Sequence, residues 1–171
     1  MFQNFYPNEY LDSVYKINFN KLKQEGIKGI LFDIDNTLVP HGEPADEKVL
    51  ELFQMLKQMG IQTCLISNNK EPRVKPFATL VNSPYLYDAH KPSIRNYKEA
   101  MKIMGTDKGS TIFVGDQLFT DIYGANRAGI PTILVEPIHP KEEIQIVLKR
   151  YLEKIVLYFY RKNTKKKKRY L

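Results

Sequence analysis

Short apolar runs alternate with amphipathic stretches along most of this 171-residue chain, and this alternation restricts the fold more than any other feature. The runs are too short for helices and are typical of strands that are buried on both faces of a sheet. Five segments are therefore expected to be strands: Gly29–Phe32, Thr63–Ile66, Tyr85–Tyr87, Thr111–Val114 and Thr132–Val135.

Helical spacing of apolar residues marks the stretches between these runs. Gly60 ends the first of them, and Pro76 should kink or shorten the second. The expected helices are Asp46–Met59, Glu71–Val81, Ser93–Met104 and Thr120–Ala128, with one or two short helices within Asn8–Gln24.

Strands that alternate with helices predict an α/β fold, in which helices cover both faces of a parallel sheet. We expect a single domain over residues 1–160 with a core at about 25–137, followed by a disordered basic tail at 161–171. Ligands of such sheets bind beyond the carboxyl ends of the strands. The residues that follow each strand are therefore the candidates for chemistry.

Two carboxylates, Asp33 and Asp35, follow the first expected strand. Side chains two residues apart on an extended chain point the same way, and such crowding of like charge calls for a cation or a shared proton. Mg²⁺, which prefers oxygen ligands, would satisfy it. A calcium loop beginning at Asp33 is excluded, because Leu38 and Pro44 occupy its required Gly and Glu positions. Taken alone, an Asp-x-Asp pair is more often a turn or a cap.

Ser67 and Asn68 follow the second strand. They either cap the next helix or, with the backbone N–H groups at its start, cradle a phosphoryl group. Lys91 precedes Pro92, which we expect in the first turn of a helix. The proline would keep Lys91 extended, so that its ammonium group can point inward.

A second acidic pair, Asp116 and Asp121, follows the strand at Thr111–Val114. Gly115 allows the backbone to approach closely beside Asp116. Asp116 would stand beside Asp33 if their two strands are neighbours. Asp121 could equally be a surface residue of the following helix.

Taken in order, these segments resemble the four motifs of the haloacid dehalogenase phosphatase superfamily. The matching residues are Asp33-Ile34-Asp35-Asn36-Thr37, Ser67-Asn68, Lys91, and Gly115-Asp116 followed by Asp121. The longer runs Asp33–Val39, Ile66–Lys70, His90–Pro92 and Gly115–Gly129 are similar to the YqeG-type, cap-less subclass IIIA, a group akin to phosphatidylglycerophosphate phosphatases.

The resemblance implies a Mg²⁺-dependent phosphomonoester hydrolase that forms an aspartyl-phosphate intermediate. Asp33 would be the nucleophile, and Asp35 would protonate the leaving group and then deprotonate water. Ser67, Asn68 and Lys91 would bind the phosphoryl group. The metal would be held by Asp33, Asp116 and the backbone carbonyl of Asp35. Asp121 would support it, either directly or by orienting water and Lys91.

Neither usual insertion point for a cap domain has room for one. Residues Leu38–Pro44 form one short loop, and Lys70–Asp88 holds little beyond one helix. The site should therefore be open, which fits a phosphate group on something bulky: a protein, a nucleic-acid end or a lipid headgroup.

The C-terminal segment combines an apolar helical stripe, beginning at Glu142, with seven cations between Arg161 and Arg169. Without these seven, the chain has equal numbers of basic and acidic residues. The helix could pack on the sheet and carry a solubilising tail, or it could bind an anionic membrane surface. A nucleic-acid partner for the tail is also consistent with this charge.

Three functions follow from these observations. The first is a phosphatase that acts on a lipid such as phosphatidylglycerophosphate. The second is a phosphatase for phosphoproteins or nucleic-acid ends, and the third is an RNA- or ribosome-associated binding module that uses the tail. The chain lacks a signal-peptide pattern at its start and any apolar run long enough to span a bilayer. We therefore expect a cytoplasmic protein, peripheral on the inner face of the membrane if the tail binds lipid.

Overall fold

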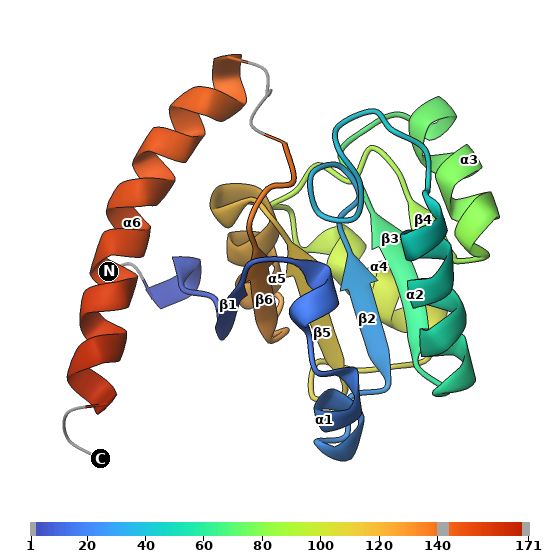
Figure 1. Ribbon diagram of the computed structural model, residues 1–171, viewed down its shortest axis with the longest axis horizontal. Helices are drawn as coiled ribbons and strands as arrows, with labels where there is room; N and C mark the ends of the chain where they lie inside the picture. The colour runs from blue at the N-terminus through green and yellow to red at the C-terminus, as the bar shows by residue number, and fades with distance from the viewer. Residues whose placement is uncertain (1–2, 140–143, 169–171) are drawn as a thin grey trace.

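The computed structural model describes residues 3–139 and 144–168, and its centre is a parallel six-stranded sheet (Figure 1). The strand order is β1-β6-β5-β2-β3-β4. This arrangement confirms the predicted α/β class. The strands are β1 (Glu9–Leu11), β2 (Gly29–Phe32), β3 (Gln62–Ile66), β4 (Tyr85–Leu86), β5 (Thr111–Gly115) and β6 (Thr132–Val135).

Helices cover both faces of the sheet. Helices α1, α2 and α3 share one apolar core with the sheet, α4 and α5 share a second, and α6 packs near the β1 edge (Figure 1). The helices are α1 (Phe19–Gln24), α2 (Glu47–Gln58), α3 (Glu71–Val81), α4 (Arg95–Met104), α5 (Tyr123–Arg127) and α6 (Ile144–Lys168), with short helical turns η1 (Gln3–Phe5), η2 (Val14–Lys16) and η3 (Leu118–Ile122).

The side chains of β2 alternate between the two cores, as the pleat of a strand requires. Ile30 and Phe32 lie in the core with α2 and α3, whereas Leu31 lies in the core with α4. All three are fully buried. This burial on both faces explains why the segment is apolar without a period of two.

The ends of α2 and α3 lie close to where the sequence predicts them. The Asp46 carboxylate accepts a hydrogen bond from the Val49 N–H (2.9 Å) and so caps α2. Helix α3 keeps its predicted span of Glu71–Val81. Pro76 lies inside this helix and does not shorten it.

Two local predictions were wrong. The segment expected to hold only short helices, Asn8–Gln24, also contains β1, whose three residues pair with β6. The helix expected over Thr120–Ala128 begins earlier, as the π-helical turn η3, and continues into α5. Helix α6 continues through part of the expected basic tail, as far as Lys168, while residues 169–171 lie outside the described residues.

The centre of the sheet is also the point where the chain reverses its direction of winding. Strand β2 pairs with β3 on one side and with β5 on the other, with Phe32 opposite Val114. The Asp33 N–H donates to the Val114 carbonyl (3.0 Å). The residues that follow β2 and β5 therefore lie side by side at such a switch point, where ligands of open α/β sheets bind.

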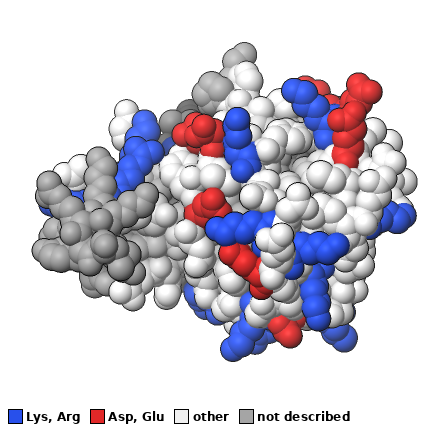
Figure 2. All heavy atoms as spheres, turned by 60° about the horizontal axis from the view of Figure 1, so that its bottom comes forward, with Lys and Arg blue, Asp and Glu red and all other residues white. Residues whose placement is uncertain are grey.

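No domain is inserted between β2 and α2 or between α3 and β4, all within the described range 3–139. The predicted absence of a cap is confirmed. A search of the described helices found none with the length and apolar character needed to cross a bilayer. On the face shown in Figure 2, acidic and basic side chains are interspersed, in keeping with the charge balance of the chain upstream of Arg161.

The contact between Gly124 of α5 and Tyr97 of α4 yields a prediction about stability. A Cβ atom at Gly124 would lie 2.5 Å from the Tyr97 hydroxyl and 2.8 Å from its ring. Replacing a helical Gly by Ala ordinarily stabilises a protein by up to about 1 kcal/mol. Here we expect Gly124→Ala to destabilise by about 1–3 kcal/mol through overpacking, measured by urea unfolding. A stabilised variant would show that the two helices separate without strain.

Candidate active site

The side chain of Lys91 lies at the centre of the polar groups beyond the sheet. Its ammonium group donates to Asp33 Oδ1 (2.6 Å) and to Asp121 Oδ1 (2.7 Å), and all three side chains are at least nine-tenths buried. Burial alone would lower the pKa of Lys91, but Asp121 and Asp33 outweigh it and hold that pKa above its ordinary value. Lys91 is therefore a fixed cation between two carboxylates.

The backbone of Lys91 is held by Asn68. The Asn68 side-chain amide accepts from the Lys91 N–H (2.7 Å) and donates to the Lys91 carbonyl (3.4 Å). Helix α4 begins only at Arg95, so Pro92 is not in its first turn as predicted. The inward direction of Lys91 was predicted correctly, and Asn68 holds its backbone in place.

Asp33 and Asp116 face each other across the hydroxyl of Thr37. Thr37 Oγ1 lies 3.2 Å from Asp33 Oδ2 and 3.1 Å from Asp116 Oδ1, and a hydroxyl has one proton to donate. One of the two carboxylate oxygens is thus left without that donor. Asp116 stands beside Asp33, as the strand order requires.

Three buried carboxylates, those of Asp33, Asp116 and Asp121, form a group that fits a divalent cation. One oxygen of each lies within 4.8 Å of the others. Hard cations such as Mg²⁺ prefer these oxygen ligands. The carboxylate of Asp35 is not part of this group, and the resemblance implied only its backbone carbonyl as a metal ligand.

Burial and crowded negative charge raise the pKa values of two carboxylates in this group, those of Asp33 and Asp116. Burial, together with Asp121 and against the pull of Lys91, raises the pKa of Asp33 to about 6. Burial and the charges of Asp33 and Asp121 raise the pKa of Asp116 well above its usual range, although Arg150 opposes this. A bound cation would relieve this repulsion.

Asp35 is held by a separate set of donors. Asp35 Oδ1 accepts from the Gly42 N–H (2.7 Å) and from Arg73 Nη2 (3.0 Å), and Oδ2 accepts from Asn69 Nδ2 (2.7 Å). Arg73 also donates to the Glu43 carbonyl (2.7 Å). The Asp35 side chain is therefore hydrogen-bonded to α3, to Asn69 and to the loop after β2. It is not hydrogen-bonded to Lys91, which contacts Asp33 and Asp121.

The position of Asp121 depends on close backbone packing at Gly115. A Cβ atom at Gly115 would lie 2.5 Å from Asp121 Oδ2, which accepts from the Gln117 N–H (3.1 Å). The Tyr97 hydroxyl donates to the carbonyls of Thr120 (3.0 Å) and Asp121 (3.3 Å). These contacts hold the π-helical turn and direct Asp121 toward Lys91.

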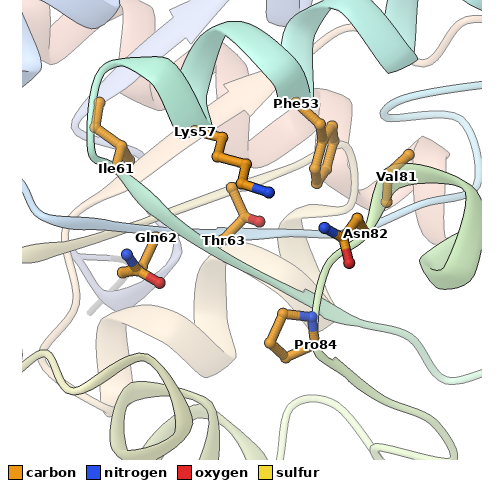
Figure 3. A pocket seen from close by; sticks show the side chains of 8 residues that line it. All are labelled: Phe53, Lys57, Ile61, Gln62, Thr63, Val81, Asn82 and Pro84. Carbon is orange, nitrogen blue, oxygen red and sulfur yellow. The ribbon is translucent and has the colours of Figure 1, made fainter.

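Ser67 lies at the end of β3 on the same edge of the sheet. It is buried, and its hydroxyl accepts from the Asn69 N–H (3.1 Å). A hollow of about 160 Å³ lies at the other end of β3, where Gln62 and Thr63 begin the strand (Figure 3). That hollow lies away from the carboxylates, so it takes no part in the site.

Sequence reasoning gave no role to several residues that complete the site: Thr37, Asn69, Arg73 and Arg150. Thr37 and Asn69 lie within the recognised segments, where their polar side chains could have been considered. Arg73 lies in the first turn of α3 and Arg150 lies in α6, each far along the chain from its aspartate. Only the tertiary structure brings these arginines to Asp35 and Asp116.

Sequence comparison relates the chain to known proteins. Residues 41–129 match the family described as haloacid dehalogenase-like hydrolase. The chain is 37% identical to "Probable phosphatase YqeG" of Bacillus subtilis over 90% of each chain. It is 29% identical to "Phosphatidylglycerophosphate phosphatase 1, chloroplastic/mitochondrial" of Arabidopsis thaliana, with 86% of this chain covered. The chain spans only 48% of the length of that plant protein.

Comparison with solved structures shows a similar fold in a known phosphatase. The cobalt-bound form of a deoxy-D-mannose-octulosonate 8-phosphate phosphatase from Haemophilus influenzae matches with a TM-score of 0.52 and 16% identity. The match covers 81% of this chain and 91% of that one. At this identity the likeness concerns the arrangement of strands and helices.

The raised carboxyl pKa values predict how pH and a divalent cation affect stability. Because Asp33 has a pKa near 6 in the folded state and an ordinary value near 4 when unfolded, the metal-free protein should lose stability as pH rises from 4 to 6. Mg²⁺ should offset this loss by binding the ionised carboxylates. At 100 times its Kd it should stabilise by about 2.7 kcal/mol, which raises Tm by roughly 5–10 °C at pH 7.5.

The shift in Tm should be smaller at pH 5, which is below the raised pKa of Asp33, and it should nearly vanish in Asp116→Asn. Differential scanning calorimetry in chelator and in Mg²⁺ would measure both effects. An equal shift in the Asp116→Asn variant would place the ion elsewhere.

Proposed function

Because this chain belongs to the haloacid dehalogenase-like hydrolases, we propose that it is a phosphatase that hydrolyses phosphomonoesters through an aspartyl phosphate on Asp33. The observation that carries the proposal is the buried group at the switch point. There Asp33 lies 2.6 Å from the ammonium of Lys91, and its carboxylate joins those of Asp116 and Asp121. A carboxylate in this position combines a nucleophile with a fixed positive charge for a phosphoryl group.

In the first step a carboxylate oxygen of Asp33 attacks phosphorus, and the bond from phosphorus to the alcohol oxygen breaks. Asp35 gives its proton to the departing oxygen. The ammonium of Lys91 and the hydroxyl of Ser67 donate to phosphoryl oxygens, where negative charge is spread in the transition state. Asn68 contributes by holding the backbone of Lys91.

In the second step water attacks phosphorus of the aspartyl phosphate. Asp35 accepts the proton of that water, and the bond between phosphorus and Asp33 breaks to release inorganic phosphate. Asp35 must exchange its contacts with Gly42, Asn69 and Arg73 to take part in these transfers. The loop after β2 is thereby coupled to the chemistry.

We further propose Mg²⁺ as the cofactor. Asp33, Asp116 and the backbone carbonyl of Asp35 would hold it, with Asp121 in support. When bound, the ion would supply positive charge that offsets the repulsion between the carboxylates and the anionic phosphoryl group. The crowding of Asp33, Asp116 and Asp121 supports this assignment, as do the raised pKa values of Asp33 and Asp116.

A bulky substrate suits this site better than a small free phosphate ester. The chain carries no cap domain within residues 3–139, so nothing closes over a small molecule to exclude water. Similarity to a plant phosphatidylglycerophosphate phosphatase favours a lipid phosphate. We propose phosphatidylglycerophosphate as the substrate, ahead of phosphoproteins and nucleic-acid ends.

The outer face of α6 supports contact with a membrane surface. Large apolar side chains recur there at helical spacing and are 42–68% exposed: Leu148, Tyr151, Leu152, Ile155, Tyr158 and Phe159. The sequence after Glu153 contains eight basic residues and no acid. Such a helix fits an anionic lipid surface, with aromatic rings at headgroup depth and cations near the phosphates.

A phosphate-release assay tests the proposed reaction. With Mg²⁺, the wild type should hydrolyse phosphatidylglycerophosphate in mixed micelles faster than phosphopeptides, nucleotide ends or soluble aryl phosphates. Asp33→Asn should lower turnover at least 10³-fold, because an amide cannot form the acyl phosphate, while circular dichroism stays unchanged. Retained turnover in folded Asp33→Asn would exclude the mechanism. A preference for phosphopeptides or nucleotide ends would replace the proposed substrate.

The basic end of α6 should serve binding to membranes and not chemistry. A variant that ends at Tyr160 keeps every residue of the site, so its hydrolysis of a soluble aryl phosphate should remain within about twofold. Its binding to anionic vesicles should fall several-fold in co-sedimentation, and that of the wild type should weaken with salt. Vesicles of neutral lipid serve as the control. Unchanged vesicle binding with lost RNA affinity would indicate a nucleic-acid partner.

A further inference from the structure

The inner face of α6 reaches the proposed metal site. Arg150 Nη1 donates to the Asp116 backbone carbonyl (2.6 Å), and Nη2 donates to Asp116 Oδ2. The Asp116 side chain is fully buried, and only 17% of the Arg150 side chain is exposed. A planar guanidinium group thus holds the main chain and the carboxylate of one residue together.

Glu153, one turn further along α6, fixes this arginine. Its Oε2 accepts from Arg150 Nη1 (3.0 Å), and its Oε1 accepts from the Leu118 N–H (2.8 Å). Only 6% of Glu153 is exposed, and burial raises its pKa while Arg150 opposes the rise. The two side chains therefore bind the segment after β5 at three points.

The two oxygens of Asp116 have different surroundings. Oδ1 lies 3.1 Å from the Thr37 hydroxyl, which also contacts Asp33, so this oxygen faces the other carboxylates. Oδ2 faces Arg150 on the side of α6. The oxygen that faces Asp33 is therefore separate from the one that Arg150 binds.

The formal charges agree with a cation that binds while Arg150 stays in place. Five carboxylates, those of Asp33, Asp35, Asp116, Asp121 and Glu153, are paired with the three cations Arg73, Lys91 and Arg150. This set has a formal charge of −2, which one divalent ion neutralises. Without Arg150 the charge would be −3.

We propose that Arg150, braced by Glu153, is a positioning residue that orients Asp116 for the divalent cation, so that α6 is part of the active site. The inference rests on the metal site of the proposed function. Partners that orient a metal ligand typically contribute 10- to 100-fold to metal affinity. Helix α6 thus has two faces: the inner one holds Asp116, and the outer one carries the exposed apolar side chains.

Isothermal titration of the full chain with Mg²⁺ tests this role without relying on turnover. Arg150→Ala should weaken Mg²⁺ binding 10- to 100-fold, and Glu153→Gln should weaken it less. Arg150→Lys should give an intermediate affinity, because lysine restores the charge but cannot hold the Asp116 backbone carbonyl and Oδ2 together as a fork. Lys149→Ala, which removes an exposed cation beside Arg150, should leave the affinity unchanged.

Unchanged affinity in Arg150→Ala would overturn the proposal. Tighter binding would overturn it in favour of competition between the arginine and the ion. Thermal unfolding in chelator establishes that each variant folds. If Arg150→Ala does not fold, the affinities of the two single variants Arg150→Lys and Glu153→Gln decide the question. The wild type could bind Mg²⁺ more tightly than Arg150→Ala and yet show no phosphatase activity. That result would uphold this inference and reject the proposed reaction. A wild type that binds no Mg²⁺ would reject both.

Discussion

The ion pairs of one buried ammonium group, that of Lys91, join the parts of this site. Asp33 follows β2, Lys91 follows β4 and Asp121 follows β5, so the three meet only if the sheet has its observed strand order. Removal of Lys91 would leave buried carboxylates without compensation, which is more unfavourable than the loss of an exposed pair. The sheet, the Asn68 contact and the packing at Gly115 can all be understood as means of keeping this group in place.

Much of the fold was predictable because its signals are local. Runs such as Gly29–Phe32 are apolar on both faces, and caps such as Asp46 act within a few residues. Strand β1 was missed because Glu9–Leu11 is a strand only through its pairing with β6, more than 120 residues away. The aspartates and Lys91 were found because each follows a strand. Arg73 and Arg150 were missed because a basic residue on a helix resembles any solvated cation until the tertiary structure gives it a buried partner.

The absence of a cap changes what the rest of the chain has to provide. In this protein the rim of the site is built from the loop after β2, the first turn of α3 and the inner face of α6. Arg73 reaches Asp35 from α3, and Arg150 reaches Asp116 from α6. The carboxylates are thus held by fixed charges from two helices that follow different parts of the sheet.

The pairing of β1 with β6 also bears on how the protein is made. A ribosome adds about 5–20 residues per second, so β1 waits roughly 6 to 25 s for residues 132–135 to be synthesised. Until then Tyr10 and Leu11 have no neighbouring strand in the sheet, and Asp116 lacks its contact with Arg150 until that later residue is also made. We expect the newborn chain to acquire its sheet centre first and its β1 edge and Asp116 contacts last. The enzyme would then become active only after α6 has been synthesised and has packed.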